Sequence, residues 1–100
     1  KGGENIAPRE IDEALLEHEA VLEAAAFPRA CDDYGQRVEA CVCLKKGRHV
    51  SENELREFCE RLIGAYKTPD NIYFLDDLPK GPSGKVQRMK LIDLTQSVSN

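Results

Sequence analysis

The sequence predicts an α+β domain in which a small sheet of about three strands is flanked by helices. Three observations support this prediction. Residues 7–18 and 51–64 repeat their apolar side chains at helical spacing, and residues 37–44 alternate as a strand does. The predicted elements follow one another in the order helix, strand, strand, helix, strand, helix. The length of 100 residues suits a single domain.

The first helix is expected over residues 7–18. Pro8 suits the first helical position, and the mostly acidic residues after it favour the positive end of a helix. One buried stripe is formed by Ile11, Ala14, Leu15 and His18. We interpret His18, at the end of this stripe, as a packing residue rather than a ligand.

Two strands are expected next, separated by a polar turn at residues 31–36. Residues 21–30 are apolar, and Pro28 is expected to end the first strand. Residues 37–44 alternate between two sets of side chains, Val38, Ala40, Val42 and Leu44 against Arg37, Glu39, Cys41 and Cys43. This period of two predicts a strand with one face on the core.

The second helix has the clearest start. Ser51 and Glu54 have the spacing of a capping box, and Gly64 can end the helix. Its buried face is expected to consist of Leu55, Phe58, Cys59, Leu62 and Ile63. Residues 71–75 then form a third strand, and residues 87–94 form a short last helix.

The four cysteines contain no C-x-x-C pair, so a zinc site has little support and we predict no metal site. We expect them to be reduced packing residues of a cytoplasmic protein. They are Cys31, Cys41, Cys43 and Cys59.

Composition and charge argue against several classes of protein. No apolar run approaches the ~20 residues of a membrane span, so none is expected. The net charge of −4 argues against nucleic-acid binding. Glu4 to Glu23 holds seven acidic residues, whereas residues 80–90 hold four basic and no acidic ones. The basic segment indicates either a small anionic partner or a solvated tail.

Residues 78–88, LPKGPSGKVQR, form a loop that is rich in glycine, proline and lysine. A phosphate-binding P-loop, G-x-x-x-x-G-K-[ST], is excluded because Pro79 replaces its first glycine and Val86 its hydroxyl residue. The prolines still restrict the free loop, and a lysine at its tip suits a phosphate or carboxylate oxygen. A surface turn with a solvated lysine is the alternative. A second loop with lysine and glycines, Lys1 to Gly3, precedes the first helix. Each loop alone is a weak indication of anion binding, and the occurrence of both in one small domain is a more specific one.

With these two loops, the sequence resembles the mobile C-terminal lid domain of adenylate-forming enzymes. Its start, KGGENIAPREID, is similar to the glycine-rich loop and helix that open this lid. LPKGPSGKVQR is similar to the lid's lysine motif, L-P-K-[TS]-x-x-G-K-[VI]-x-R. DDYGQRVEACVCL and GAYKTPDNIYFLDDLP also match, so the resemblance runs from Lys1 to about Leu94. Bacterial acyl-CoA synthetases are the most similar group.

The resemblance implies that residues 1–100 are the lid of an acyl-CoA synthetase, a cytoplasmic enzyme. Such enzymes use ATP to convert a carboxylic acid to an acyl-adenylate, and then form a thioester with coenzyme A. An N-terminal adenylation domain holds the acid, the ATP and its Mg²⁺. We expect that domain upstream, because Met89 is the only methionine, and we expect the isolated lid to be inactive. Two alternatives stay open: a carrier-protein thiol as the acceptor, or a stand-alone binding module without catalysis.

The resemblance also implies roles for individual residues. Lys85 corresponds to the catalytic lysine of adenylation, whose ammonium contacts the carboxylate and the α-phosphate. Gly81 departs from the family's threonine or serine, so a hydroxyl contact is not expected there. The residues implied for coenzyme A are Lys1, Gly2, Gly3, Tyr34, Gly35, Tyr66 and Lys67. For both tyrosines, half-buried packing at strand ends is the alternative.

Overall fold

The computed structural model describes residues 7–31 and 35–96 and confirms the predicted α+β class and element order. The elements are α1 (Pro8–Leu16), β1 (Val21–Cys31), β2 (Gly35–Leu44), α2 (Glu52–Ile63), β3 (Ile72–Phe74) and α3 (Lys90–Leu94). They form one sheet in the order β1-β2-β3, in which β1 and β2 are antiparallel and β2 and β3 are parallel.

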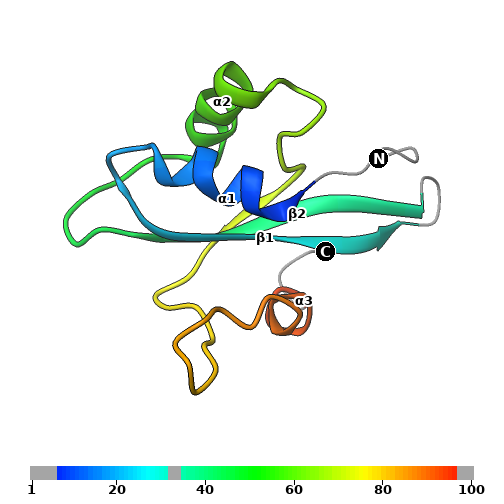
Figure 1. Cartoon of the computed structure of the whole chain (residues 1–100). Coiled ribbons are helices and arrows are strands. Elements are labelled where there is room, and N and C mark those ends of the chain that lie inside the picture. The colour runs from blue at the N-terminus through cyan, green and yellow to red at the C-terminus, as the bar shows by residue number, and fades with distance from the viewer. Residues whose placement is uncertain (1–6, 32–34, 97–100) are drawn as a thin grey trace.

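The sheet is covered on both faces (Figure 1). Helices α1 and α2 lie on one face, and α3 with the segment that precedes it lies on the other. Each side has its own apolar cluster. The first consists of Ile11, Ala14, Leu15, Val21, Ala26, Ala40, Val42, Leu55, Cys59 and Ile72. The second consists of Ala25, Phe27, Cys41, Cys43, Leu78 and Leu91.

Strand β2 is therefore buried on both faces, and the prediction of a single core face was wrong. Ala40 and Val42 point into the first cluster, whereas Cys41 and Cys43 point into the second. The pattern was misleading because cysteine packs as a small apolar residue. Burial raises the pKa of the Cys41 thiol to about 12 and that of Cys43 to about 11. The packing role is confirmed for these two and for the buried, unpaired Cys59, while the side chain of Cys31 lies outside the described part.

Pro28 does not end β1, contrary to the prediction. The strand continues to Cys31, and Pro28 lies opposite Val38 in the hairpin with β2. Strand β1 is at the edge of the sheet, where the position that lacks an N–H can face away from the partner strand. The edge therefore accommodates a proline that a central strand would exclude.

The first helix is shorter than predicted but buries the expected residues. Pro8 is in its first turn, and Ile11, Ala14 and Leu15 are buried. His18 lies just beyond the helix, where its Nδ1 accepts a hydrogen bond from the Ala20 amide at 3.1 Å. Its ring meets that of Phe58 edge-on, with centroids 4.9 Å apart. This is the packing role that the sequence predicted for His18.

The capping box of α2 is confirmed. The Glu54 amide donates to Ser51 Oγ, and the Ser51 amide donates to Glu54 Oε1, both at 3.1 Å. Gly64 follows the helix with a φ of +89°, a value that favours glycine. Leu62, however, is 51% exposed, so its predicted burial was wrong. Ile63 packs against the same cluster as Leu55 and Cys59, so the core covers that row of the stripe and Leu62 lies at its margin.

A buried carboxylate ties β2 to the rest of the sheet. Glu39 is 1% exposed and accepts hydrogen bonds from Arg29 Nε, Asn71 Nδ2 and the Tyr73 hydroxyl at 2.5, 2.8 and 3.0 Å. Arg29 also donates to Thr95 Oγ1, directly after α3. Three donors offset the cost of burying the charge, and the same arginine attaches α3 to the sheet.

The third strand and the last helix are found within the predicted segments, and each is shorter than predicted. No helix among the described residues is long and apolar enough to cross a membrane.

We expect Leu55→Ala to lower the free energy of unfolding by ~2–5 kcal/mol, because the Leu55 side chain is fully buried and its removal leaves a cavity in the core. Leu62→Ala, on the same helix, is the matched control and should cost less than about 0.5 kcal/mol. Urea unfolding followed by circular dichroism measures both. Equal losses would contradict the assignment of the α2 core face.

Candidate functional site

The loop that carries Lys85 is a short hairpin of residues 79–87, called the lysine hairpin below. Lys80 and Val86 pair as an isolated antiparallel bridge. The Gln87 amide donates to the Pro79 carbonyl at 2.8 Å, and the Gly81 amide donates to the Lys85 carbonyl at 2.9 Å. The backbone beside Lys85 is thus held by ordinary ladder hydrogen bonds, as in a regular hairpin.

The turn at the tip of the lysine hairpin explains why a proline and a glycine, Pro82 and Gly84, occur there. The Gly84 amide donates to the Gly81 carbonyl at 3.0 Å, which closes a four-residue turn with Pro82 in second place. Gly84 follows with a φ of +85°, as in three-residue hairpin loops that end in a left-handed residue. A Cβ at Gly84 would meet no atom within 4 Å, so its requirement is conformational. At Gly81 the backbone is not left-handed, and a Cβ would lie 3.4 Å from Gln87 Nε2.

The side chain of Lys85 is exposed. Its ammonium has no hydrogen bond or ion pair within residues 7–31 and 35–96. A fixed backbone thus carries a charge that is available to a ligand. This arrangement suits an anion that approaches from outside the domain.

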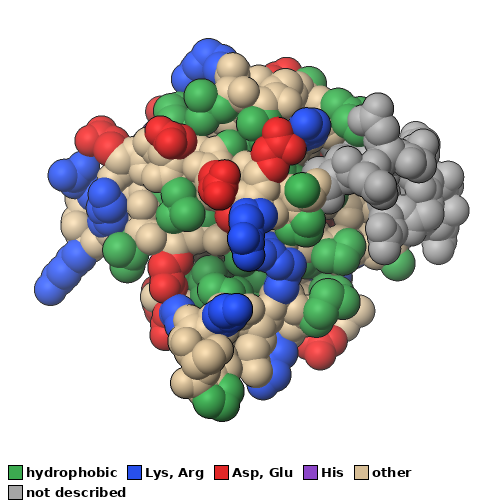
Figure 2. All heavy atoms as spheres, in the orientation of Figure 1, with side chains coloured by type: hydrophobic (Ala, Val, Ile, Leu, Met, Phe, Trp, Pro, Cys, Tyr) green, Lys and Arg blue, Asp and Glu red, His purple; other side chains and the backbone are tan. Residues whose placement is uncertain are grey.

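Two other cations of the basic segment, Lys80 and Arg88, differ from Lys85, whereas Lys90 is exposed as Lys85 is. The Lys80 ammonium lies 3.0 Å from a carboxylate oxygen of Glu23 and 3.0 Å from one of Asp77. Asp77 and Glu23 raise the pKa of Lys80, and the Lys80 hydrogen bond lowers the pKa of Asp77. Arg88 is paired with Asp12 at 3.0 Å. Accordingly, Figure 2 shows acidic and basic side chains interleaved on this face of the molecule.

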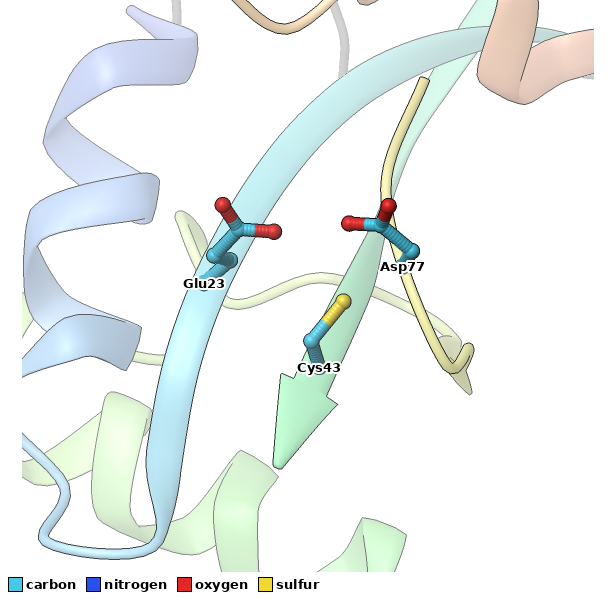
Figure 3. A group of neighbouring side chains, drawn as sticks. All are labelled: Glu23, Cys43 and Asp77. Atoms are coloured by element: carbon cyan, nitrogen blue, oxygen red, sulfur yellow. The ribbon is translucent and has the colours of Figure 1, made fainter. Parts of the chain in front are cut away.

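Glu23, Cys43 and Asp77 form the carboxylate and thiol cluster that Figure 3 shows, with ligand atoms within 4.8 Å of one another. The Lys80 ammonium already supplies the cation, because it bonds both carboxylates. Burial also raises the pKa of Cys43 to about 11, so the thiol is protonated and is a poor metal ligand at neutral pH. The arrangement fits an internal ion pair and does not fit a resident Mg²⁺.

The residues implied for coenzyme A are only partly within the described residues. Lys1, Gly2, Gly3 and Tyr34 lie outside them. Gly35 is the first residue of β2 and lies opposite Cys31.

Tyr66 and Lys67 lie in the turn after α2. Tyr66 is 44% exposed and lies in a turn rather than at a strand end, so both interpretations of its ring stay open. Lys67 donates to both carboxylate oxygens of Glu10 in α1, at 3.2 and 3.1 Å. Lys67 therefore joins the α1 and α2 side of the sheet, whereas the lysine hairpin and α3 lie on the opposite side (Figure 1). Among the described residues, the structure therefore places Lys67 and Lys85 on opposite sides of the sheet.

Comparison with known proteins identifies the family. A family model described as AMP-binding enzyme C-terminal domain matches residues 10–85. The chain belongs to this family.

Two curated relatives and one solved structure illustrate the similarity. The chain is 54% identical over 93 residues to a sulfoacetate–CoA ligase of Cupriavidus necator. This alignment covers 93% of the chain and 18% of that protein. It is 43% identical over 88 residues to an oxalate–CoA ligase of Saccharomyces cerevisiae, covering 88% of the chain and 16% of that protein. The crystal structure of ATP-bound MatB from Rhodopseudomonas palustris superposes with a TM-score of 0.89 at 28% identity, over 99% of this chain and 20% of that one. The chain thus spans less than a fifth of the length of these two curated relatives.

Sequence reasoning missed how this AMP-binding enzyme C-terminal domain holds its lysine hairpin. Lys80 and Arg88 form internal ion pairs, and two of the three carboxylates, Glu23 and Asp12, come from the acidic first quarter of the chain. A signal was present, because an acidic segment and a basic segment in one small domain can neutralise each other. Arg88 is also the last fixed position of the lysine motif.

We expect Gly84→Ala to strain the tip of the lysine hairpin by about 1–2 kcal/mol, because a Cβ disfavours left-handed backbone. Gly84→Asn should cost less, since asparagine visits this region more readily. Hydrogen exchange at the Gly81 and Gln87 amides measures the effect as faster exchange. Gly81→Ala is the control within the same hairpin and should leave the exchange of Gln87 unchanged. Equal acceleration by both alanines would contradict the described turn.

Proposed function

We propose that this domain is the mobile C-terminal lid of an ATP-dependent, AMP-forming acyl-CoA synthetase. In the first step a carboxylate oxygen attacks the α-phosphorus of ATP and pyrophosphate leaves. In the second step the thiol of coenzyme A attacks the acyl carbon, loses its proton, and AMP leaves. A large N-terminal adenylation domain, upstream of residues 1–100 in a cytoplasmic enzyme, holds the acid and the nucleotide.

The observation that carries the proposal is the exposed Lys85 ammonium on a backbone fixed by hydrogen bonds. Negative charge is redistributed between the carboxylate and the α-phosphate as the new bond forms. A cation placed there stabilises the transition state more than the ground state, and removal of one such group typically costs ~10²–10³ in rate. Because the hairpin itself is regular, movement of the whole domain brings the charge to the nucleotide and takes it away.

The side of the sheet that carries α1 and α2, opposite the lysine hairpin, binds coenzyme A in the second step. The aromatic ring of Tyr66 suits stacking on adenine, and Lys67 suits a phosphate of coenzyme A. Lys67 is held by Glu10, so a bound phosphate would share the ammonium with that carboxylate. The placement of Lys67 and Lys85 on different sides supports a domain that presents one face in each step. The roles of Lys1, Gly2, Gly3, Tyr34 and Gly35 in binding the same ligand belong to this proposal.

Mg²⁺ belongs with ATP on the N-terminal domain in this proposal. The cluster of Glu23, Cys43 and Asp77 does not offer it a site, since Lys80 occupies both carboxylates. Coenzyme A is favoured over a carrier-protein thiol because both curated relatives described above are CoA ligases by name.

In the complete enzyme, we expect Lys85→Ala to lower the rate of adenylate formation by ~10²–10³, because it removes the charge that meets the α-phosphate. Thioester formation from supplied acyl-adenylate should be largely unchanged. Pyrophosphate release and acyl-CoA formation are measured separately. Lys90→Ala, an exposed cation at the start of α3, is the control and should affect neither. An equal loss in both half-reactions would assign Lys85 a structural role.

A second experiment compares acceptors. Given acyl-adenylate, the complete enzyme should form thioester with free coenzyme A and not with a phosphopantetheine-bearing carrier protein. Mass spectrometry of both products measures this preference. Faster loading of the carrier protein would favour a carrier-loading enzyme, and the absence of thioester formation with either thiol, together with no pyrophosphate release from acid and ATP, would favour a non-catalytic binding module.

A further inference from the structure

We propose that Arg88 and Asp12 form a positioning pair for Lys85, and this inference rests on the proposed function. The pair fixes the direction in which the lysine hairpin leaves the body of the domain. Neither side chain contacts the reacting groups in this proposal. Both act on catalysis through the placement of the Lys85 ammonium.

The geometry of the pair is specific. Arg88 Nη1 donates to Asp12 Oδ1 at 3.2 Å, and Arg88 Nη2 donates to Asp12 Oδ2 at 3.0 Å. Two parallel hydrogen bonds of this kind fix orientation as well as distance. The Asp12 side chain is 14% exposed and that of Arg88 is 31% exposed, so the pair is less screened than a surface ion pair.

The same two side chains also bind the free edge of β1. The Ala26 amide donates to Asp12 Oδ1 at 2.6 Å, and Arg88 Nη1 donates to the Ala26 carbonyl at 2.6 Å. Both backbone groups of one edge residue are thereby satisfied by groups from outside the sheet. Helix α1, strand β1 and the end of the lysine hairpin meet at this point.

The connection from Arg88 to Lys85 is short. Arg88 follows Lys85 by three residues, and the ladder bonds of Lys85 and Gln87 leave little freedom between them. The start of the hairpin is held by Lys80, whose partners Glu23 and Asp77 are 30% and 80% exposed, whereas Asp12 is 14% exposed. The pair of Arg88 and Asp12 is the better enclosed of these two attachments. Its loss would let the hairpin tilt, and a misplacement of about 1 Å can cost ~10²-fold in rate.

Asp12→Asn and Arg88→Lys in the complete enzyme test the proposal. Asparagine retains an oxygen that can accept from the Ala26 amide but loses the charge that holds Arg88. Lysine retains the charge of Arg88 but loses the planar fork. We expect each variant to lower the kcat of adenylation by ~10–10²-fold. The KM for ATP, and thioester formation from supplied acyl-adenylate, should be nearly unchanged.

The matched controls are Glu19→Gln and Arg48→Lys. These residues form an arginine–carboxylate pair at 3.0 Å, but their side chains are 82% and 52% exposed, and no ion pair joins them to the lysine hairpin among the described residues. Both controls should retain the rates of both half-reactions. Urea unfolding of all four variants identifies any that lose activity only because they are destabilised. Arg88→Lys is chosen because it retains the positive charge and most of the side chain's length.

The deciding measurement combines Asp12→Asn with Lys85→Ala. If Asp12 acts through Lys85, the double variant should adenylate at the same rate as Lys85→Ala alone. A further loss in the double variant, or an equal loss of thioester formation in Asp12→Asn, would reduce the pair to a structural role and overturn the inference. If Lys85→Ala spares adenylation, the proposed function fails as well, so the two failures are distinguishable.

Discussion

The carboxylate of Asp12 is the interaction on which the arrangement of this domain depends most. It belongs to α1, accepts a hydrogen bond from the edge of β1, and holds Arg88, which directly follows the lysine hairpin. Helix α1 and the hairpin cover opposite faces of the sheet (Figure 1), so this contact links the two sides around the edge of β1. In the proposed function, the domain presents alternate faces to a partner domain and must therefore rotate as one body. A charged link across its edge contributes to that rigidity.

The local parts of the fold could be predicted from the sequence. The capping box at Ser51, the left-handed Gly64 and the position of β3 follow from rules that act within a few residues. The burial of both faces of β2 did not follow, because it depends on α3 and the segment before it, far along the chain. The continuation of β1 through Pro28 depends on its place at an edge, which no local pattern determines.

For the candidate site as well, one part could be predicted from the sequence and another part could not. The lysine motif located Lys85, but residue types alone could not distinguish a charge that is available from charges that are already paired. Lys80 and Lys85 lie in one short loop, yet only Lys80 has carboxylates at hydrogen-bond distance among the described residues. Arg88 and Asp12 are separated by 76 positions, so their contact is a property of the folded chain. Motifs therefore indicate candidates, and the tertiary contacts distinguish side chains that are available to a ligand from side chains that are already paired.

The backbone at Gly81 has an evolutionary consequence. The position is not left-handed, and an added Cβ would touch only the flexible end of Gln87. A threonine or serine, as in the family motif, therefore meets no steric barrier there. A single codon change from glycine to serine could therefore introduce a hydroxyl without rebuilding the turn.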